Sequence, residues 1–150
     1  MYLLAHTSIL ISCPVQRAFD FAANLENFST WFPGVIAIAS DDGLPFTAVG
    51  KQYRETVAMP LRGRREVSIR VKEAVSPHRL VTEGALATLL PRMEIDFHER
   101  GPDACEMTWR MLSRNRALLP RWTVLPLARR VMARRAAVGL RRLKARLERG

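Results

Sequence analysis

Residues 9–34 read ILISCPVQRAFDFAANLENFSTWFPG, and this stretch decides how the fold begins. A β-type run within residues 2–12 predicts a first strand. Two short helices are predicted within residues 14–31, because Pro14 suits a first helical turn, apolar residues recur at helical spacing after it, and a Pro-Gly pair follows. Ser12 stands where a cap for the first helix is expected.

The segment that follows, residues 33–113, is rich in predicted strands. Val67, Ile69 and Val71 alternate with polar residues, which indicates a strand with one buried face and one wet face. Similar alternation recurs around Ile95, and short turn signals separate the runs. Strands joined by short hairpins form an antiparallel sheet. We therefore expect six strands here, seven with the first.

The period of the apolar residues changes near the C-terminus, where residues 117–148 predict one long helix. Pro120 is a candidate start, and Pro126 either kinks the helix or is its true start. The apolar positions fall within an arc of roughly 80° at 100° per residue. They are Leu118, Trp122, Leu125, Met132, Ala136, Leu140, Leu143 and Leu147.

The predicted class is α+β, with a curved seven-stranded antiparallel sheet wrapped around the long helix. A helix with one apolar stripe must cover one face of the sheet. Such a sheet seldom closes tightly around one helix, so a cavity between them is expected. Small-ligand cavities are typically about 300–1,000 Å³. Residues 85–91, ALATLLP, show no alternation and fit either a lip at the cavity mouth or a distorted strand.

The length and composition are those of an ordinary globular domain. The 150 residues are 48% hydrophobic and 25% charged, which excludes a disordered or fibrous chain. No run of 18 apolar residues is present, and residues 1–12 lack the basic flank and cleavage site of a signal peptide. Two cysteines do not make a disulfide framework. We therefore expect a cytoplasmic protein.

The net charge of +10 is concentrated at one end of the chain. Residues 1–113 carry 12 basic and 13 acidic side chains, whereas residues 114–150 carry 12 basic and one acidic side chain, Glu148. The predicted C-terminal helix is therefore strongly basic. Three interpretations stay open: a solvated outer face, attachment to an anionic membrane surface helped by Trp122, or binding to the ribosome through RNA phosphates.

The opening stretch also carries a family resemblance. Residues 9–21 and 25–34 give a strand, a Pro-led helix with Phe19 at its centre, and a helix ending in Trp-x-Pro. This order resembles the START-like, or Bet v 1-like (SRPBCC), superfamily, and the bacterial branch called polyketide cyclase/dehydrase and lipid transport in particular. The resemblance continues to the C-terminal helix. It implies a helix-grip fold and a single START-like ligand-binding domain over residues 1–150.

That branch includes cyclase/aromatases, lipid carriers, coenzyme-Q-binding proteins and ribosome-associating toxins, and a fold does not choose among them. Our first hypothesis is a non-catalytic carrier or binder of a small hydrophobic molecule, such as a lipid, quinone or polyketide-like compound. The alternative is a cyclase, aromatase or dehydratase that acts on a polyketide-like chain. A second alternative is a ribosome- or membrane-associating module. We predict no cofactor and no metal, and the sequence does not indicate the oligomeric state.

The predicted ligand-binding residues are aromatic, sulfur-containing and aliphatic side chains on inward faces, together with one carboxylate. Thioethers and rings suit an irregular hydrophobic ligand; plain core packing is the competing interpretation. The set is Trp31, Phe32, Tyr53, Glu55, Val57, Met59, Val67, Ile69, Met93, Ile95, Phe97, Met107, Trp109, Met111, Trp122, Leu125 and Met132.

Tyr53, Glu55 and Arg129 are the weak candidates for catalytic roles. Glu55 shares a strand face with Tyr53, and an apolar cavity would raise the pKa of its carboxyl into the range of a general acid or base. The alternative is that Glu55 pairs with an arginine in water. Arg129 falls inside the apolar arc and would clamp an anionic head group, unless Pro126 shifts the helical phase and turns it to solvent.

Overall fold

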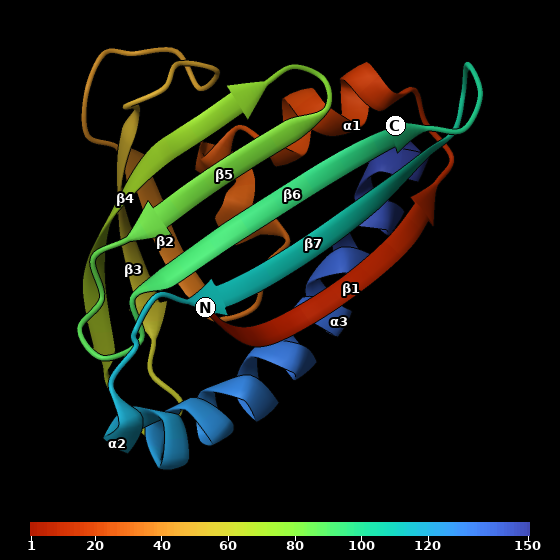
Figure 1. The fold of residues 1–150 in the computed structure, drawn as a ribbon. Coiled ribbons are helices and arrows are strands. Elements are labelled where there is room, and N and C mark those ends of the chain that lie inside the picture. The colour runs from red at the N-terminus through yellow and green to blue at the C-terminus, as the bar shows by residue number, and fades with distance from the viewer.

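The computed structural model describes residues 1–150 and contains seven strands and a few helices (Figure 1). In chain order the elements are β1 (Tyr2–Ile11), α1 (Val15–Ala22), the 3-10 helix η1 (Leu25–Thr30), β2 (Val35–Ser40), β3 (Gln52–Ala58), β4 (Arg64–Val75), β5 (Arg79–Gly84), β6 (Pro91–Glu99), β7 (Cys105–Ser113), α2 (Leu118–Trp122) and α3 (Val124–Arg149).

The strands form one antiparallel sheet in the order β1-β7-β6-β5-β4-β3-β2. The strands β2 to β7 each pair with the next strand in the chain. Strand β1 pairs with β7 and not with β2, because α1 and η1 separate it from β2. Val67, Ile69 and Val71 on β4 are buried while their polar neighbours are exposed, as the alternation predicts. The curved sheet holds α3 on its concave side (Figure 1). The predicted α+β helix-grip fold is confirmed.

The first helix begins differently from the sequence prediction. Pro14 is the residue before the helix, with extended backbone angles, and no side chain caps the helix. The predicted cap, Ser12, is wrong: its backbone amide donates instead to the Glu148 carboxylate of α3 at 2.8 Å. The contact joins the end of β1 to the end of α3.

The basic C-terminal segment forms two helices, whereas its sequence pattern predicts one. The break is at Thr123, whose backbone angles are φ −118° and ψ −77°. Pro126 lies in the first turn of α3, where a helix needs no amide donor. The apolar stripe faces the core along α3. Its two residues in α2, Leu118 and Trp122, are exposed to solvent. No helix is both long and apolar enough to span a membrane.

The buried stripe of α3 fixes the helix to the sheet. Leu140, Leu143 and Leu147 are buried, and α3 packs mainly along β1. Gly139 lets the helix approach the turn after η1: a Cβ there would lie 3.0 Å from a ring carbon of Phe32 and 3.3 Å from the backbone oxygen of Trp31. Close packing at this point holds α3 against the segment that follows η1.

Truncating the last anchor of α3 is expected to weaken the fold. Leu147→Ala removes a nearly fully buried side chain at the end of the helix, which should lower the free energy of unfolding by about 2 kcal/mol. Urea denaturation followed by circular dichroism measures the change. Leu118→Ala is the control, because Leu118 is 71% exposed and its truncation should change stability by less than about 0.5 kcal/mol.

Candidate functional site

A cavity of about 390 Å³ lies between α3, the strands β3 and β4, and the segment that joins β5 to β6. Sixteen of its 24 lining residues are hydrophobic. A smaller chamber of about 50 Å³ adjoins it and is bounded by Ile69, Thr82 and Met93, among others. Glu55, Val67 and Met111 belong to the walls of both. The volume lies in the range of small-molecule sites.

The helix wall of the cavity is not the apolar stripe predicted from the sequence. Val124, Ala128, Val131 and Arg135 line the cavity, at i, i+4, i+7 and i+11 spacing. At 100° per residue this face is rotated by roughly 110° from the buried stripe. Only Met132 of the predicted stripe reaches the cavity. The apolar spacing of residues 124, 128 and 131 is the sequence signal that indicates this second face.

Residues 85–91 form the lip of the cavity, one of the two structures that the sequence allows. Leu86, Leu89 and Pro91 are in its wall. The Asn115 side-chain amide donates to the Thr88 carbonyl at 2.6 Å, and the backbone amide of residue 114 donates to the carbonyl of residue 90 at 2.9 Å. The lip is therefore tied to the connection between β7 and α2.

Glu55 is a buried carboxylate in the cavity wall. It is 7% exposed, it forms no ion pair, and its Oε2 atom has no hydrogen-bond partner. Burial raises the pKa of Glu55 to about 7. The predicted arginine partner in water is absent: across the strands, Glu55 is paired in register with Ile38 and Val67. Near neutral pH a large share of the carboxyl is protonated and able to donate a hydrogen bond.

Arg135, which is not among the residues predicted from the sequence, is the cation in the helix wall. Its Nη2 donates to the Ala58 carbonyl at 3.0 Å, and its guanidinium packs beneath Gly34, where a Cβ would lie 2.5 Å from it. It makes no ion pair with any carboxylate. Burial lowers the pKa of this guanidinium, although arginine stays charged at neutral pH. Arg135 therefore places in the cavity wall a positive charge that no carboxylate of the chain pairs with.

The predicted ligand-binding residues separate into three groups in the structure. Seven line the main cavity: Phe32, Glu55, Val57, Met59, Val67, Met111 and Met132. Two, Ile69 and Met93, line only the inner chamber. The rest lie outside both walls: Trp31, Tyr53, Ile95, Phe97, Met107, Trp109 and Leu125 are buried, and Trp122 is exposed.

The buried members of the third group are core residues because helices fill that part of the concave face. Phe19 of α1 meets the Phe97 ring edge-on at 5.7 Å, and Phe32 stacks on Trp109 at 5.1 Å. Trp122 lies outside because the helix breaks at Thr123, so the predicted angular phase does not extend into α2.

Two of the three catalytic candidates do not face the cavity. The expectation that Arg129 clamps a ligand is wrong: it is exposed, and its guanidinium lies 6.0 Å from the Tyr2 ring. The alternative, Arg129 facing solvent, is the one observed. Tyr53 is fully buried outside the cavity wall, and burial raises the pKa of its hydroxyl to about 12. Glu55 alone remains a candidate by position.

The two cysteines come together in the core, although they lie far apart in sequence. Both Cys13 and Cys105 are buried free thiols. Burial raises the pKa of each, that of Cys105 to about 11. A protonated thiol is a poor nucleophile. The cysteines are therefore core residues beside the α1 end of the sheet.

A curved antiparallel sheet that wraps around a long C-terminal helix defines the helix-grip class of folds. The family model described as "Polyketide cyclase / dehydrase and lipid transport" matches residues 4–148, and the chain belongs to this family. The comparison with curated proteins gives no match.

Solved structures share the fold at low sequence identity. A solution structure of a protein from Thermobifida fusca matches with a TM-score of 0.72 at 17% identity, covering 97% of this chain and 93% of that one. The di-domain ARO/CYC StfQ from the steffimycin biosynthetic pathway matches with a TM-score of 0.73 at 12% identity, covering 96% of this chain and 50% of that one. XoxI from Bacillus cereus matches with a TM-score of 0.68 at 12% identity, covering 98% of this chain and 96% of that one.

Proposed function

We propose that residues 1–150 form a single domain that binds a small hydrophobic molecule in the cavity between the sheet and α3. The observation that carries the proposal is the cavity of about 390 Å³ with mainly apolar walls. Burying an apolar ligand there is favourable, because each square ångström of apolar surface removed from water contributes roughly 25 cal/mol. The family description, with its cyclases and lipid transport, supports the same class of ligand.

The two polar groups of the wall suggest that this ligand is an amphiphile with an acidic head. Arg135 is a half-buried cation without a carboxylate partner, which suits a carboxylate or another anion. Glu55 lies where the main cavity meets the inner chamber. Its protonated carboxyl would donate to a carbonyl or ether oxygen farther along the ligand. The ligand is then held by its apolar body and oriented by its two polar ends.

Binding is tested by calorimetric titration with three probes of graded chemistry: dodecanoate, dodecanol and 2-naphthoate. The proposal predicts saturable one-to-one binding of at least one probe. If none binds up to its solubility limit, the cavity is not a site for ligands of this class, and the proposal fails.

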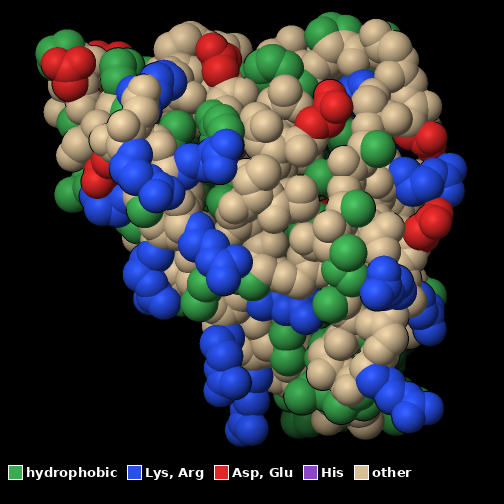
Figure 2. Space-filling view, turned by 180° about the vertical axis from the view of Figure 1, so that it is seen from behind, with side chains coloured by type: hydrophobic (Ala, Val, Ile, Leu, Met, Phe, Trp, Pro, Cys, Tyr) green, Lys and Arg blue, Asp and Glu red, His purple; other side chains and the backbone are tan.

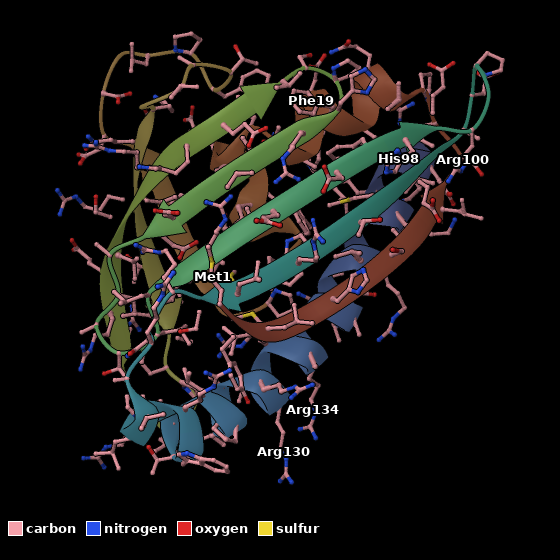
Figure 3. All side chains as sticks on the ribbon, viewed as in Figure 1. Met1, Phe19, His98, Arg100, Arg130 and Arg134 are labelled. Atoms are coloured by element: carbon pink, nitrogen blue, oxygen red, sulfur yellow. The ribbon has the colours of Figure 1, made fainter.

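Replacing the cavity arginine is expected to remove the preference for an acidic head. Arg135→Gln keeps an amide donor but loses the charge, so the affinity for dodecanoate should fall by about tenfold, while that for dodecanol should hardly change. Arg134→Gln is the matched control, since Arg134 is exposed and points away from the molecule (Figure 3). Equal losses in both variants, or equal losses for both probes, would refute the role of Arg135.

A second candidate function is an acid–base reaction in the same cavity, and Glu55 is the observation that favours it. A carboxyl with a pKa of about 7 exchanges a proton readily at neutral pH. In a polyketone chain it would take a proton from a carbon between two carbonyls, and the enolate so formed would attack a second ketone carbon to close the ring. The carboxyl would return that proton to the new alkoxide and then take the second proton from the same carbon, so that a double bond forms and the hydroxyl leaves as water with that proton. Mass spectrometry of such a substrate would detect the dehydrated product, and Glu55→Gln should abolish its formation. If the protein binds such a substrate but forms no product, the acid–base function is refuted and only the carrier function remains.

A further inference from the structure

The helix α2 exposes an apolar surface that no other part of the chain covers. None of its five residues is buried, and Leu118, Leu119 and Trp122 are 71%, 74% and 81% exposed. Trp31 and Trp109 are fully buried, so Trp122 is the one tryptophan in contact with solvent. We call these three exposed side chains the apolar tip. Contiguous apolar exposure of this kind marks an interaction surface more often than an ordinary surface.

The apolar tip projects from one end of the molecule and is surrounded by cations. In Figure 1, α2 lies beyond the edge of the sheet, at the end of α3 nearest the N-terminus. Arg116, Arg121 and Arg130 are exposed around it, and residues 114–147 contain no Asp or Glu. In Figure 3 Arg130 and Arg134 extend away from α3 into solvent. The lowest third of the face in Figure 2, where α2 lies, shows Lys and Arg with hydrophobic side chains and no acidic ones.

The arginines near the tip differ from those of the sheet. On β5, β6 and β7, the side chains of Arg79, Arg92 and Arg110 lie within 2.8–3.9 Å of carboxylates. The exposed arginines of α2 and the first half of α3 have no carboxylate partner within the chain. Their charge is therefore uncompensated and available to an anionic partner.

We propose that this end of the molecule docks on an anionic membrane surface, with the apolar tip inserted among the lipids and the surrounding arginines on the head groups. A convex tip of leucine and tryptophan gains free energy by entering the interface, where tryptophan is favoured. Long arginine side chains reach back from such a tip to lipid phosphates. RNA is disfavoured as the partner, because its phosphates would leave Leu118 and Leu119 in water.

The docking surface is continuous with the cavity mouth. Val124 and Leu127 are among the exposed apolar side chains, and both also line the cavity. The lip of residues 85–91 is hydrogen-bonded to the connection that leads into α2, through Asn115 and Thr88. Insertion of the tip therefore places the open side of the cavity against the lipid. An amphiphile would then pass between membrane and cavity without crossing bulk water; this last step rests on the proposed function, whereas the docking does not.

Vesicle flotation of the full chain tests the docking. The probes are vesicles of phosphatidylcholine alone and of phosphatidylcholine with about 30% phosphatidylglycerol, at about 50 mM and about 300 mM salt. We expect binding to the anionic vesicles that weakens with salt. The fluorescence of Trp122 should shift to shorter wavelength as its ring leaves water. The double variant L119S/W122S should lower the partition coefficient by about tenfold or more.

Two controls make the result specific to this end of the molecule. Leu10→Ser changes an exposed apolar residue of β1 that is 59% exposed, and it should leave partitioning unchanged. R130Q/R134Q should weaken binding more than R141Q/R142Q, which removes the same charge farther along α3. The proposal is overturned if anionic vesicles do not bind at low salt, if L119S/W122S partitions like the unaltered protein, or if the protein binds ribosomes but not vesicles. Because no cavity ligand is needed, failure here is distinguishable from failure of the proposed binding function.

Discussion

Ala128→Trp is expected to abolish ligand binding while the protein stays folded. Ala128 is a half-buried residue on the cavity face of α3, so an indole at this position would occupy the space that a ligand needs. The affinity for the probe that binds best should fall by about a hundredfold, because the ligand can no longer bury its apolar surface against the cavity walls. Calorimetric titration measures the change, and circular dichroism with a thermal melt reports the fold.

The matched control is Ala133→Trp, which adds the same side chain at an exposed position of α3 outside the cavity wall. It should bind the probe like the unaltered protein. If Ala128→Trp destabilises the fold, Val131→Phe fills the same wall with less volume. Retention of full affinity in a folded cavity-filling variant would place the ligand elsewhere.

The second large effect is the dependence of stability on pH that comes from Glu55. Its pKa is about 7 in the folded protein and about 4.5 ordinarily. Between these values the folded state binds the proton more tightly than the unfolded state does. The contribution of Glu55 to stability is therefore full below pH 4.5 and is lost as the pH rises through about 7. The loss amounts to about 3 kcal/mol at most.

Glu55→Gln should remove this dependence, because the amide resembles the protonated carboxyl and does not ionise. At pH 8 the variant should be more stable than the unaltered protein by up to about 3 kcal/mol, and near pH 4.5 the two should be nearly equal. Urea denaturation across this pH range measures both curves. Glu66→Gln is the control, since the Glu66 side chain is 62% exposed and its replacement should shift neither end of the curve appreciably. Parallel curves for Glu55→Gln and the unaltered protein would show that the carboxyl is not buried as the structure describes.

The strands and their inward faces could be predicted from the sequence because alternation is a local pattern. Val67, Ile69 and Val71 alternate with polar residues, and the sheet buries that face. Glu55 could be assigned to the inward face of its strand by the same reasoning. Whether Glu55 contacts an arginine or an apolar wall depends on the neighbouring strands β2 and β4. The pattern of one strand does not show which residues lie beside it in the sheet.

Apart from Met132, the residues that the C-terminal helix contributes to the site are not those that local sequence patterns predict. An arc measured along residues 118–147 assumes one uninterrupted helix, and the break at Thr123 invalidates it for Trp122. Arg129 lies on the arc, but its side chain is exposed and its guanidinium lies over the Tyr2 ring. Arg135 could not be identified from the sequence, because nothing in its local pattern distinguishes it from the other arginines of this basic helix. Its role follows only from its hydrogen bond to Ala58, 77 residues away in the chain.

The most direct test of the central claim is a methyl and amide NMR titration with the probe that binds, followed residue by residue. If the ligand occupies the cavity, the largest chemical-shift changes fall on Val57, Leu89, Val131 and Met132, which line the cavity from three different parts of the chain. The exposed Leu10 and Val75 serve as references that should not move. Saturable changes confined to the outer surface, with the cavity methyl groups unaffected, would contradict the claim that this cavity is the binding site.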